Sequence, residues 1–366
     1  MTIYYVDPVS GSNSNAGTSF GAAFATTAKA ASVVAAGDSV RLCATGTETL
    51  TSTNTISFST SGTAAANIVW QGYNATGTAA LAAGSYYTIT GASMSASTDM
   101  VAVAGVQFNT FYNVFFTTAK RNIIGTTNDS SYTTQFIRCS FSAPTTNMVA
   151  VTSGSNGIGI MFVNCVMTGS GASGTQVLQN GATNRNGCTY LGCTISAFNS
   201  VIGAPGGSET GNGSEQYIGN IFANNGTVVQ PNLYTALSEF SGNVFYGNTT
   251  AICINDRSTT ARLYYITNNS FVNNTTVFLA ASSNNTFGLE FANHFYNNTT
   301  IYNGAALVSN GGTVTGNPLF NAPGSLDFRL QSGSPLINAG LNGQNIAGLP
   351  QIPGGGSVQY SQIYGG

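Results

Sequence analysis

Charged residues are scarce in this sequence of 366 residues. Only 5% of the residues are Asp, Glu, Lys or Arg, and nine basic and eleven acidic residues leave a net charge of −2. A typical soluble domain carries about 25% charged residues. There is no basic patch to neutralise phosphates, so we expect no nucleic-acid partner. A neutral polar surface suits a protein that is repeated or densely packed, where repulsion between like charges would be unfavourable.

Long hydrophobic runs are also missing. No stretch reaches the roughly 20 apolar residues of a membrane-spanning helix, so we expect no membrane insertion. The N-terminus, Met1-Thr2-Ile3-Tyr4-Tyr5, has neither the basic region nor the apolar core of a signal peptide. Two explanations stay open: a signal was removed, or the protein leaves its cell by another route, such as lysis. In either case we expect it at a virion surface or outside the cell.

Glycine and apolar residues are abundant where charge is not. The chain has 45 glycines, which taken alone would suit disorder. However, 42% of the residues are hydrophobic and 11% are aromatic, which is enough to form a buried core. We therefore expect an ordered protein.

A short pattern recurs along the chain: a Cys or Asn, any residue, then an apolar residue. Its nine first residues are separated by 26, 26, 28, 27, 23, 26, 24 and 24 positions. A period of this length is typical of solenoids. It predicts an all-β, single-stranded parallel β-helix, with about twelve coils over residues 40–335 and a length on the order of 55–60 Å. These marker residues are Asn113, Cys139, Cys165, Cys193, Asn220, Asn243, Asn269, Asn293 and Asn317.

The markers are predicted to form a structural ladder through the coils. Asn amides stacked at the strand spacing can donate and accept hydrogen bonds along the stack, and Asn tolerates the left-handed backbone of a sharp turn. Six cysteines would allow disulfides in an exposed protein. Because Cys139, Cys165 and Cys193 take marker positions, we interpret them instead as small buried thiols in the same slot.

Apolar residues stack on either side of the markers. The residues two positions after each marker predict a core column. Two further columns precede the markers, and the pattern does not show which of them faces solvent. The one that does would form an aromatic stripe on which sugars could stack. The alternative is that both columns are packed against other parts of the protein. The column two positions before the markers is Phe111, Ile137, Val163, Leu191 and Ile218, and the column three before is Phe136, Phe162, Tyr190, Tyr217 and Phe240.

A further apolar stripe follows the markers by one position. It comprises Val114, Val166, Ile221 and Val244. An exposed stripe of this kind is usually covered. We expect a homo-oligomer, a trimer of parallel solenoids, or lateral packing on a larger virion assembly to cover it.

Both ends of the chain have features that would close a solenoid. Residues 20–36 predict a short amphipathic helix over the first coil, followed by a strand over residues 39–43. The predicted boundaries are an N-terminal cap at residues 1–38, a parallel β-helix at 39–340 and a tail at 341–366. This Gly/Pro-rich tail is expected to dock on its own or a neighbouring chain.

These end segments resemble right-handed parallel β-helix proteins of the pectate-lyase-like group. The opening from Tyr4-Tyr5-Val6-Asp7-Pro8 to Gly37-Asp38-Ser39-Val40 is similar to that family's first strand and capping helix. The closing segments Asn317-Pro318-Leu319-Phe320, Leu326-Asp327-Phe328-Arg329-Leu330 and Gly333-Ser334-Pro335-Leu336 are similar to its last coil. The resemblance implies right-handed winding and three sheets per coil. It implies no particular activity, because one fold hosts many functions.

Lyases of the resembled family hold Ca²⁺ with clustered acids and use Arg or Lys as base. Calcium prefers six to eight oxygen ligands, several of them carboxylates. The eleven acids of this chain are thinly spread, and Asp256-Arg257 is the only adjacent acid–base pair. We therefore expect no metal and no cofactor.

Glycosidases need two carboxylates, roughly 5–5.5 Å or 6.5–9.5 Å apart. Glu215 and Glu239 stand five and four positions before their markers, so adjacent coils would bring them together. Glu209 lies on a long loop that could overhang them. The alternative is that these are solvated or capping carboxylates. The lone His294 follows a marker, is expected to point outward, and has no Cys or acid partner at metal-binding spacing.

Three functions are compatible with these patterns. The preferred hypothesis is a non-enzymatic virion surface protein, such as a head fibre, capsid decoration or receptor-binding spike, with a cell-surface glycan as a candidate ligand. The second is a tailspike-like glycosidase or lyase that degrades polysaccharide. The third is a secreted bacterial adhesin or surface-array protein.

Overall fold

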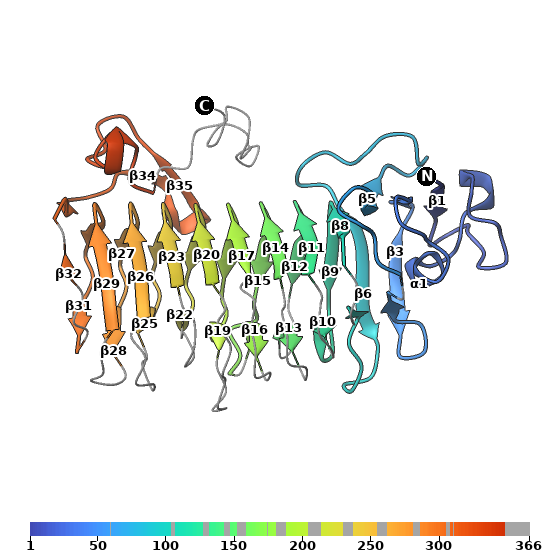
Figure 1. The fold of residues 1–366 in the computed structure, drawn as a ribbon, viewed down its shortest axis with the longest axis horizontal. Helices are drawn as coiled ribbons and strands as arrows, with labels where there is room; N and C mark the ends of the chain where they lie inside the picture. The colour runs from blue at the N-terminus through green and yellow to red at the C-terminus, as the bar shows by residue number, and fades with distance from the viewer. Residues whose placement is uncertain are drawn as a thin grey trace.

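The chain folds as a right-handed parallel β-helix, as predicted, with three long sheets around one core (Figure 1). The computed structural model describes residues 1–58, 60–103, 107–126, 132–142, 147–151, 159–173, 175–180, 188–203, 214–229, 237–254, 262–280, 286–304, 308–309 and 311–347. Within these ranges no helix has the length and apolar character needed to cross a membrane.

Each coil contributes one strand to each of three parallel sheets, named A, B and C. Sheet A contains β1 (Ile3–Val6), β2 (Ser39–Cys43), β5 (Ile68–Tyr73), β8 (Asn109–Tyr112), β11 (Tyr132–Ile137), β14 (Gly159–Val163), β17 (Thr189–Leu191), β20 (Ser214–Ile218), β23 (Leu237–Ser241), β26 (Arg262–Thr267), β29 (Thr286–Phe291) and β32 (Val308–Ser309). Sheet B contains β3 (Thr47–Thr51), β6 (Tyr87–Ser93), β9 (Val114–Thr117), β12 (Ser140–Ser142), β15 (Val166–Thr168), β18 (Thr194–Ser196), β21 (Ile221–Ala223), β24 (Val244–Tyr246), β27 (Ser270–Val272), β30 (His294–Tyr296) and β33 (Val314–Thr315). Sheet C contains β4 (Ile56–Ser57), β7 (Val101–Ala102), β10 (Asn122–Thr126), β13 (Asn147–Val151), β16 (Gln176–Asn180), β19 (Ser200–Gly203), β22 (Thr227–Val229), β25 (Thr250–Ile254), β28 (Thr276–Ala280) and β31 (Thr300–Asn303).

The number of coils is smaller than the period predicts. Sheet C has 10 strands among the described residues, so ten coils contribute to all three sheets rather than about twelve. The early coils are longer than the later ones, because long connections follow β5 and β6. The last strand of the three sheets ends at Thr315, and the residues after it leave the solenoid.

The core is built from stacked rings rather than from mixed side chains. Phe111, Phe136, Phe162, Tyr190, Tyr217 and Phe240 pair in register through sheet A, and successive ring centroids lie 4.8–5.4 Å apart. All are at most 1% exposed. The column three positions before the markers therefore faces inward. The column two before them faces outward, and its members Ile137, Val163, Leu191 and Ile218 are half-buried and aliphatic, so it is not an aromatic stripe.

A hydrogen-bonded ladder runs through the turn between sheets A and B. Each Asn side chain accepts, through Oδ1, the backbone N–H of the previous rung: Asn220 N–H donates to Asn243 Oδ1 at 2.8 Å, and Asn243 N–H to Asn269 Oδ1 at 2.9 Å. Each Nδ2 donates to a carbonyl of the aromatic column, as Asn243 does to Tyr217 at 2.8 Å. One side chain thus satisfies two buried backbone groups of the preceding coil.

Three thiols occupy the same slot in earlier coils. Cys139, Cys165 and Cys193 donate from Sγ to the carbonyls of Phe111, Phe136 and Phe162, at 3.6, 3.2 and 3.4 Å. In later coils, Asn amides donate to the carbonyls at the equivalent position, those of Tyr190, Tyr217 and Phe240. The thiols are free and at most 1% exposed. Cys43 and Cys188 are also buried and form no disulfide, whereas the side chain of Cys253 lies outside the described residues.

The ladder is shorter than predicted at both ends. Phe115 pairs with Ser140, so Val114 and not Asn113 stands at the rung below Cys139. Asn113 is the residue before the rung and has a left-handed backbone, with φ 55°. Asn317 lies beyond the last coil, where its Oδ1 accepts the N–H of Leu319. The predicted ladder was therefore wrong at both ends: Asn113 lies one position before its rung, and Asn317 lies outside the solenoid.

The left-handed conformation belongs to the residue before each rung rather than to the rung itself. Gly192, Gly219 and Gly242 precede rungs with φ of 61°, 64° and 67°. Non-glycine residues hold the same conformation in other coils: Arg138, Asn164, Asn268 and Ala292 have φ of 53°, 52°, 56° and 52°. In five of these seven turns the sequence is therefore Gly or Asn followed by Asn or Cys.

A second ladder, which the sequence analysis did not identify, runs through the turn between sheets B and C. Asn225 N–H donates to Asn248 Oδ1 at 3.0 Å, and the pattern continues to Asn274 and Asn298. Their Nδ2 groups donate to carbonyls of the inward column of sheet B, as Asn248 does to Phe222. The signal was present as Asn-x-Thr triplets at the same period.

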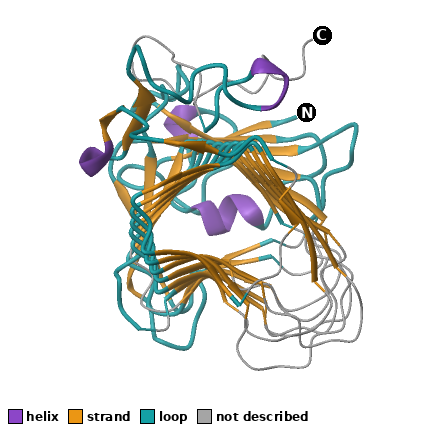
Figure 2. Cartoon of the chain, turned by 90° about the vertical axis from the view of Figure 1, so that its left-hand side faces the viewer, coloured by secondary structure: helices purple, strands orange, loops and turns teal. Residues whose placement is uncertain are grey.

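The two ends of the solenoid are finished differently. At the N-terminal end, α1 (Thr27–Ala31) lies across the open core (Figure 2). It is much shorter than the helix predicted over residues 20–36, part of which forms η1 (Phe20–Ala22). The predicted strand over residues 39–43 is β2.

At the other end, residues 316–347, here named the C-terminal arm, fold back over the outer face of sheet B. The arm contains the antiparallel pair β34 (Phe320–Ala322) and β35 (Asp327–Leu330), with η2 (Pro323–Ser325) and η3 (Leu341–Gly343). Its side chains form one buried cluster with sheet B: Ile221, Ala223, Val244, Val272, Phe320, Phe328, Leu336, Ile346 and Ala347. Residues 348–366, most of the predicted tail, lie outside the described residues.

The arm corrects the expectation that another chain must cover the stripe after the markers. Ile221 and Val244 are 6% and 1% exposed beneath it. Val114 belongs to the central core because of the shifted register. Val166, beyond the reach of the arm, is 39% exposed.

Loss of one rung should destabilise the solenoid strongly. We expect Asn243→Ala to lower the free energy of unfolding by about 2–4 kcal/mol, because buried N–H and C=O groups of neighbouring coils lose their partners. Asn243→Cys should recover part of this loss, since a thiol donates to the same carbonyl in three other coils. Denaturant unfolding followed by circular dichroism measures both variants. Equal destabilisation by Ala and Cys would contradict the shared slot.

Left-handed residues offer a matched pair of substitutions. Ala292→Gly should raise the free energy of unfolding by about 0.5–1 kcal/mol, because Gly removes the strain of φ 52° at some entropic cost. Gly242→Ala should lower it by about 1 kcal/mol, since the nearest atom to an added Cβ is 4.0 Å away and only backbone strain changes. Denaturant midpoints that move in the same direction would rule out this account.

Candidate functional site

The outer face of sheet A carries Glu239, one of the acids predicted from the sequence. Two outward columns cross it. One contains Tyr112, Ile137, Val163, Leu191, Ile218, Ser241, Thr267 and Phe291. The other contains Gln135, Met161, Thr189, Gln216, Glu239, Tyr265 and Leu289. The first column is therefore aliphatic from β11 to β20, whereas the second column mixes polar side chains with Met161 and carries one acid, Glu239, on β23.

Glu239 has polar neighbours in the second column. It pairs in register with Gln216 on one neighbouring strand and with Tyr265 on the other. Gln216 Nε2 donates to Glu239 Oε2 at 3.3 Å, and the Tyr265 side chain is 38% exposed. In the adjacent column, Thr267 Oγ1 donates to Ser241 Oγ at 3.3 Å. This group, here named the Glu239 cluster, combines a carboxylate, an amide, hydroxyls and an exposed ring.

The structure does not place the predicted carboxylate pair in register. Glu215 pairs with Ser238, whereas its neighbour Gln216 pairs with Glu239. Consecutive residues of a strand lie on opposite faces, so the backbone register sets Glu215 and Glu239 one position apart. The side chain of Glu215 is not among those described. Glu209, Asp256 and Arg257 also lie outside the described residues.

Other described carboxylates are occupied with structural bonds. Asp7 accepts the N–H groups of Val9 and Ser10. Asp38 accepts the N–H groups of Thr2 and Ala35, Asp99 pairs with Arg121, and Asp327 pairs with Arg329. Among the described side chains, Glu239 is therefore the acid best placed to meet a ligand on the sheet A face.

Two further acids are buried near opposite ends of the core. Glu48 is 3% exposed and accepts the N–H of Thr27, the first residue of α1, at 2.8 Å, together with the hydroxyl of Tyr87 at 2.8 Å. Glu290 is 1% exposed and accepts the hydroxyl of Tyr302. Burial raises the pKa of both carboxyls, and these hydrogen bonds oppose the shift only in part. Sequence reasoning missed both roles, because neither Glu lies in a motif.

His294 does not point to solvent, contrary to the prediction. It is buried beneath the C-terminal arm. Its Nε2 lies 2.8 Å from the carbonyl oxygen of Gly316, which can only accept, so Nε2 carries the proton and Nδ1 accepts from the Ser270 hydroxyl at 2.8 Å. Burial lowers the pKa of this imidazole. His294 therefore fastens the start of the arm to sheet B.

No cluster of three or more His, Cys, Asp or Glu that could hold a metal occurs in the part of the chain that the structure describes. The stacked thiols of Cys139, Cys165 and Cys193 do not form one either, since each is engaged with a carbonyl.

Solved structures of other proteins share the fold of this chain. No family model and no curated protein matches the sequence. Among solved structures, pectate lyase Pel9A superimposes with a TM-score of 0.63 at 16% identity, over 93% of this chain and 92% of that one. The GH136 lacto-N-biosidase from Eubacterium ramulus matches with a TM-score of 0.46 at 10% identity, over 86% and 67%. A rhamnogalacturonan lyase matches with 0.41 at 15%, over 81% and 74%. The chain thus has the pectate-lyase-like parallel β-helix fold, and at this identity the likeness extends to the fold alone.

Acidification should weaken the attachment of the arm through His294. A His whose folded pKa is lowered binds its proton more readily when unfolded, so its contribution to stability is full above about pH 6.5 and falls as the pH drops below it. We expect the thermal midpoint of the wild type to fall more than that of His294→Gln between pH 7 and pH 5. Buried Glu48 and Glu290 have raised pKa values and act in the opposite direction, so the difference between the two proteins isolates His294. Parallel pH profiles would contradict this role.

Proposed function

We propose that this protein binds a neutral polysaccharide along the outer face of sheet A, with the Glu239 cluster at the centre of the site. The observation that carries the proposal is the alignment of Gln216, Glu239 and Tyr265 on three successive strands, exposed or half-exposed on a flat face. An exposed ring stacks on the apolar face of a sugar, and the carboxylate and amide accept and donate to its hydroxyls.

The charge of the face favours a neutral ligand over an acidic one. Within the described part of the two outward columns from Gln135 to Leu289, Glu239 is the only ionisable side chain of either sign apart from Tyr265. A polyuronate would meet this carboxylate with no cation beside it, and like charges at short range repel. The fold neighbour that superimposes with a TM-score of 0.63, a pectate lyase by name, therefore supports polysaccharide as the ligand class but not pectate itself.

Cleavage of the bound glycan is the second candidate, and the names of the fold neighbours favour it over a purely structural role. Glu239 would act as the acid–base residue of a hydrolase. Its partner would have to come from acids whose side chains the structure does not describe, such as Glu209, Glu215 or Asp256. The virion-surface and adhesin hypotheses stay predictions, as do the trimer and the extracellular location.

Binding is tested with neutral and uronate oligosaccharides of matched length in isothermal titration calorimetry. We expect measurable affinity for neutral chains and little for uronates. Tyr265→Ala should weaken binding about 3- to 10-fold, because ring stacking contributes about 0.5–1.5 kcal/mol. Glu239→Gln should weaken it about 10-fold, since a hydrogen bond to a charged group contributes about 1.5–3 kcal/mol.

The matched control is Thr168→Ala, an exposed position on the outer face of sheet B, which should leave affinity unchanged. Release of reducing ends from the bound glycan, lost in Glu239→Gln and kept in Thr168→Ala, would establish hydrolysis. Tighter binding of uronates than of neutral chains, or unchanged affinity in both sheet A variants, would refute the proposal.

A further inference from the structure

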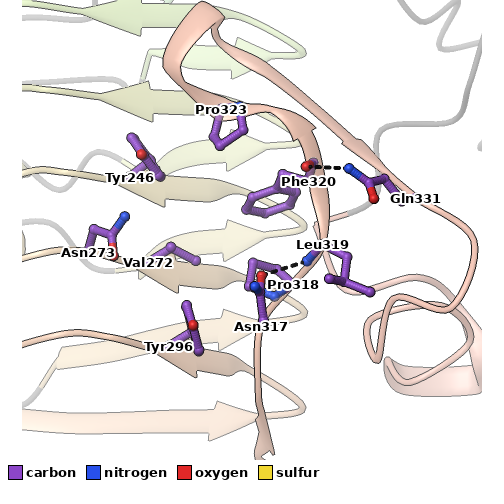
Figure 3. Close-up of a pocket in the computed structure, with 10 residues that line it drawn as sticks. All are labelled: Tyr246, Val272, Asn273, Tyr296, Asn317, Pro318, Leu319, Phe320, Pro323 and Gln331. Atoms are coloured by element: carbon purple, nitrogen blue, oxygen red, sulfur yellow. Dashed lines mark hydrogen bonds between the residues drawn. The ribbon is translucent and has the colours of Figure 1, made fainter.

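A cavity lies on another side of the molecule, where the C-terminal arm crosses sheet B. The arm leaves a cavity of about 290 Å³ between its own backbone and the strands beneath it. Figure 3 shows Tyr246, Val272 and Tyr296 along the sheet side, with Phe320, Pro318 and Pro323 facing them from the arm. This place lies over β24, β27 and β30, away from the Glu239 cluster on sheet A.

The cavity arises because one small residue interrupts a column of large ones. Tyr246, Val272 and Tyr296 pair in register on three successive strands of sheet B. Valine fills less space than tyrosine, and Val272 lies at the floor of the cavity, where it is 3% exposed because the side chains of the arm pack on it. Two coils separate the tyrosines, which sets their backbones roughly 9–10 Å apart. A puckered ring placed between the two tyrosine side chains would fill this gap better than a flat aromatic ring, because flat rings stack at a shorter spacing.

The chemistry of the walls points to an uncharged ligand. Among the lining residues that the structure describes, none carries a charge. Rings and prolines supply apolar faces, whereas Asn273 and Gln331 bring carboxamides to the rim. Gln331 is held in place because its Nε2 donates to the carbonyl of Phe320 at 3.0 Å. Predominantly apolar walls with a few convergent polar groups are the usual composition of small-molecule sites.

One bulky residue on the arm side of the cavity has a strained backbone. Leu319 has a left-handed backbone, with φ 50°. This is unfavourable for a bulky residue, and such strain tends to cluster where ligands bind. The conformation is held from both sides, since Leu319 N–H donates to Asn317 Oδ1 at 3.0 Å and its carbonyl accepts the N–H of Gln331 at 2.9 Å. The arm is thus fixed in a shape that keeps the cavity open.

We propose that this cavity binds a single neutral sugar ring, such as the terminal or branch residue of a glycan. A pyranose has apolar faces that stack on aromatic and proline rings, and a rim of hydroxyls that bind carboxamides and tyrosine hydroxyls. It is also puckered, which matches the gap across Val272. The site is independent of the Glu239 cluster and holds whether or not sheet A binds polysaccharide.

The test uses saturation-transfer NMR on the full-length protein, with methyl glycosides of glucose, galactose, mannose and N-acetylglucosamine, and with indole as a planar uncharged probe. We expect transfer to at least one methyl glycoside and little to indole. Val272→Phe fills the hollow and should weaken that binding at least tenfold. Tyr296→Ala removes one wall without adding bulk and should weaken it about 3- to 10-fold, which covers the case in which Val272→Phe does not fold.

The matched control is Thr168→Ala, which changes an exposed side chain of sheet B outside the cavity lining and should leave monosaccharide binding unchanged. If Tyr265→Ala alone abolishes binding, the ring is held on sheet A and the cavity proposal fails. The proposal also fails if no methyl glycoside shows transfer, if indole binds as well as the sugars, or if folded Val272→Phe and Tyr296→Ala both keep wild-type affinity. Loss of polysaccharide binding on sheet A has no bearing on these outcomes.

Discussion

Each coil turns sharply between sheets A and B, and this turn buries backbone groups that no strand can pair. From Cys139 to Asn293, a single side chain per coil satisfies them. Asn243 reaches the carbonyl of Tyr217 and accepts from Asn220, and Cys193 reaches the equivalent carbonyl of Phe162. An unmade hydrogen bond at such a position costs about 1–3 kcal/mol. The requirement repeats in each of these coils, so it fixes the period of this part of the chain, and the period fixes which side chains stack in the core.

The strict register has a second consequence for the surface. Outward residues of successive coils form straight columns, so a ligand-binding group must be assembled from residues about 25 positions apart. Gln216, Glu239 and Tyr265 meet in this way. Most other described acids are committed to turns, ion pairs or the ends of the core. Among the described side chains, Glu239 is the one carboxylate of the two outward columns of sheet A, and this is the basis on which a neutral glycan is proposed as the ligand.

The C-terminal arm resolves a conflict that the repeat creates. Stacking places Ile221 and Val244 on the outside of sheet B, where they would be exposed. Phe320, Phe328 and Leu336 cover them within the same chain, and His294 fastens the arm where it begins. A partner chain is therefore not required to bury this part of the stripe. Because the arm spans a column of unequal side chains, covering the stripe also creates the cavity above Val272.

The sequence alone determined the fold class, the slot shared by Asn and Cys, and strand β2, because these depend on local patterns repeated at one period. It misplaced Asn113, because Asn serves equally well at a rung and in the left-handed position before it. It could not choose the inward column, since parity is lost at each turn. Only the tertiary structure decided that Glu215 and Glu239 are out of register, that His294 is buried, and that the arm returns to sheet B. These outcomes depend on contacts between segments far apart in the chain, which no local pattern encodes.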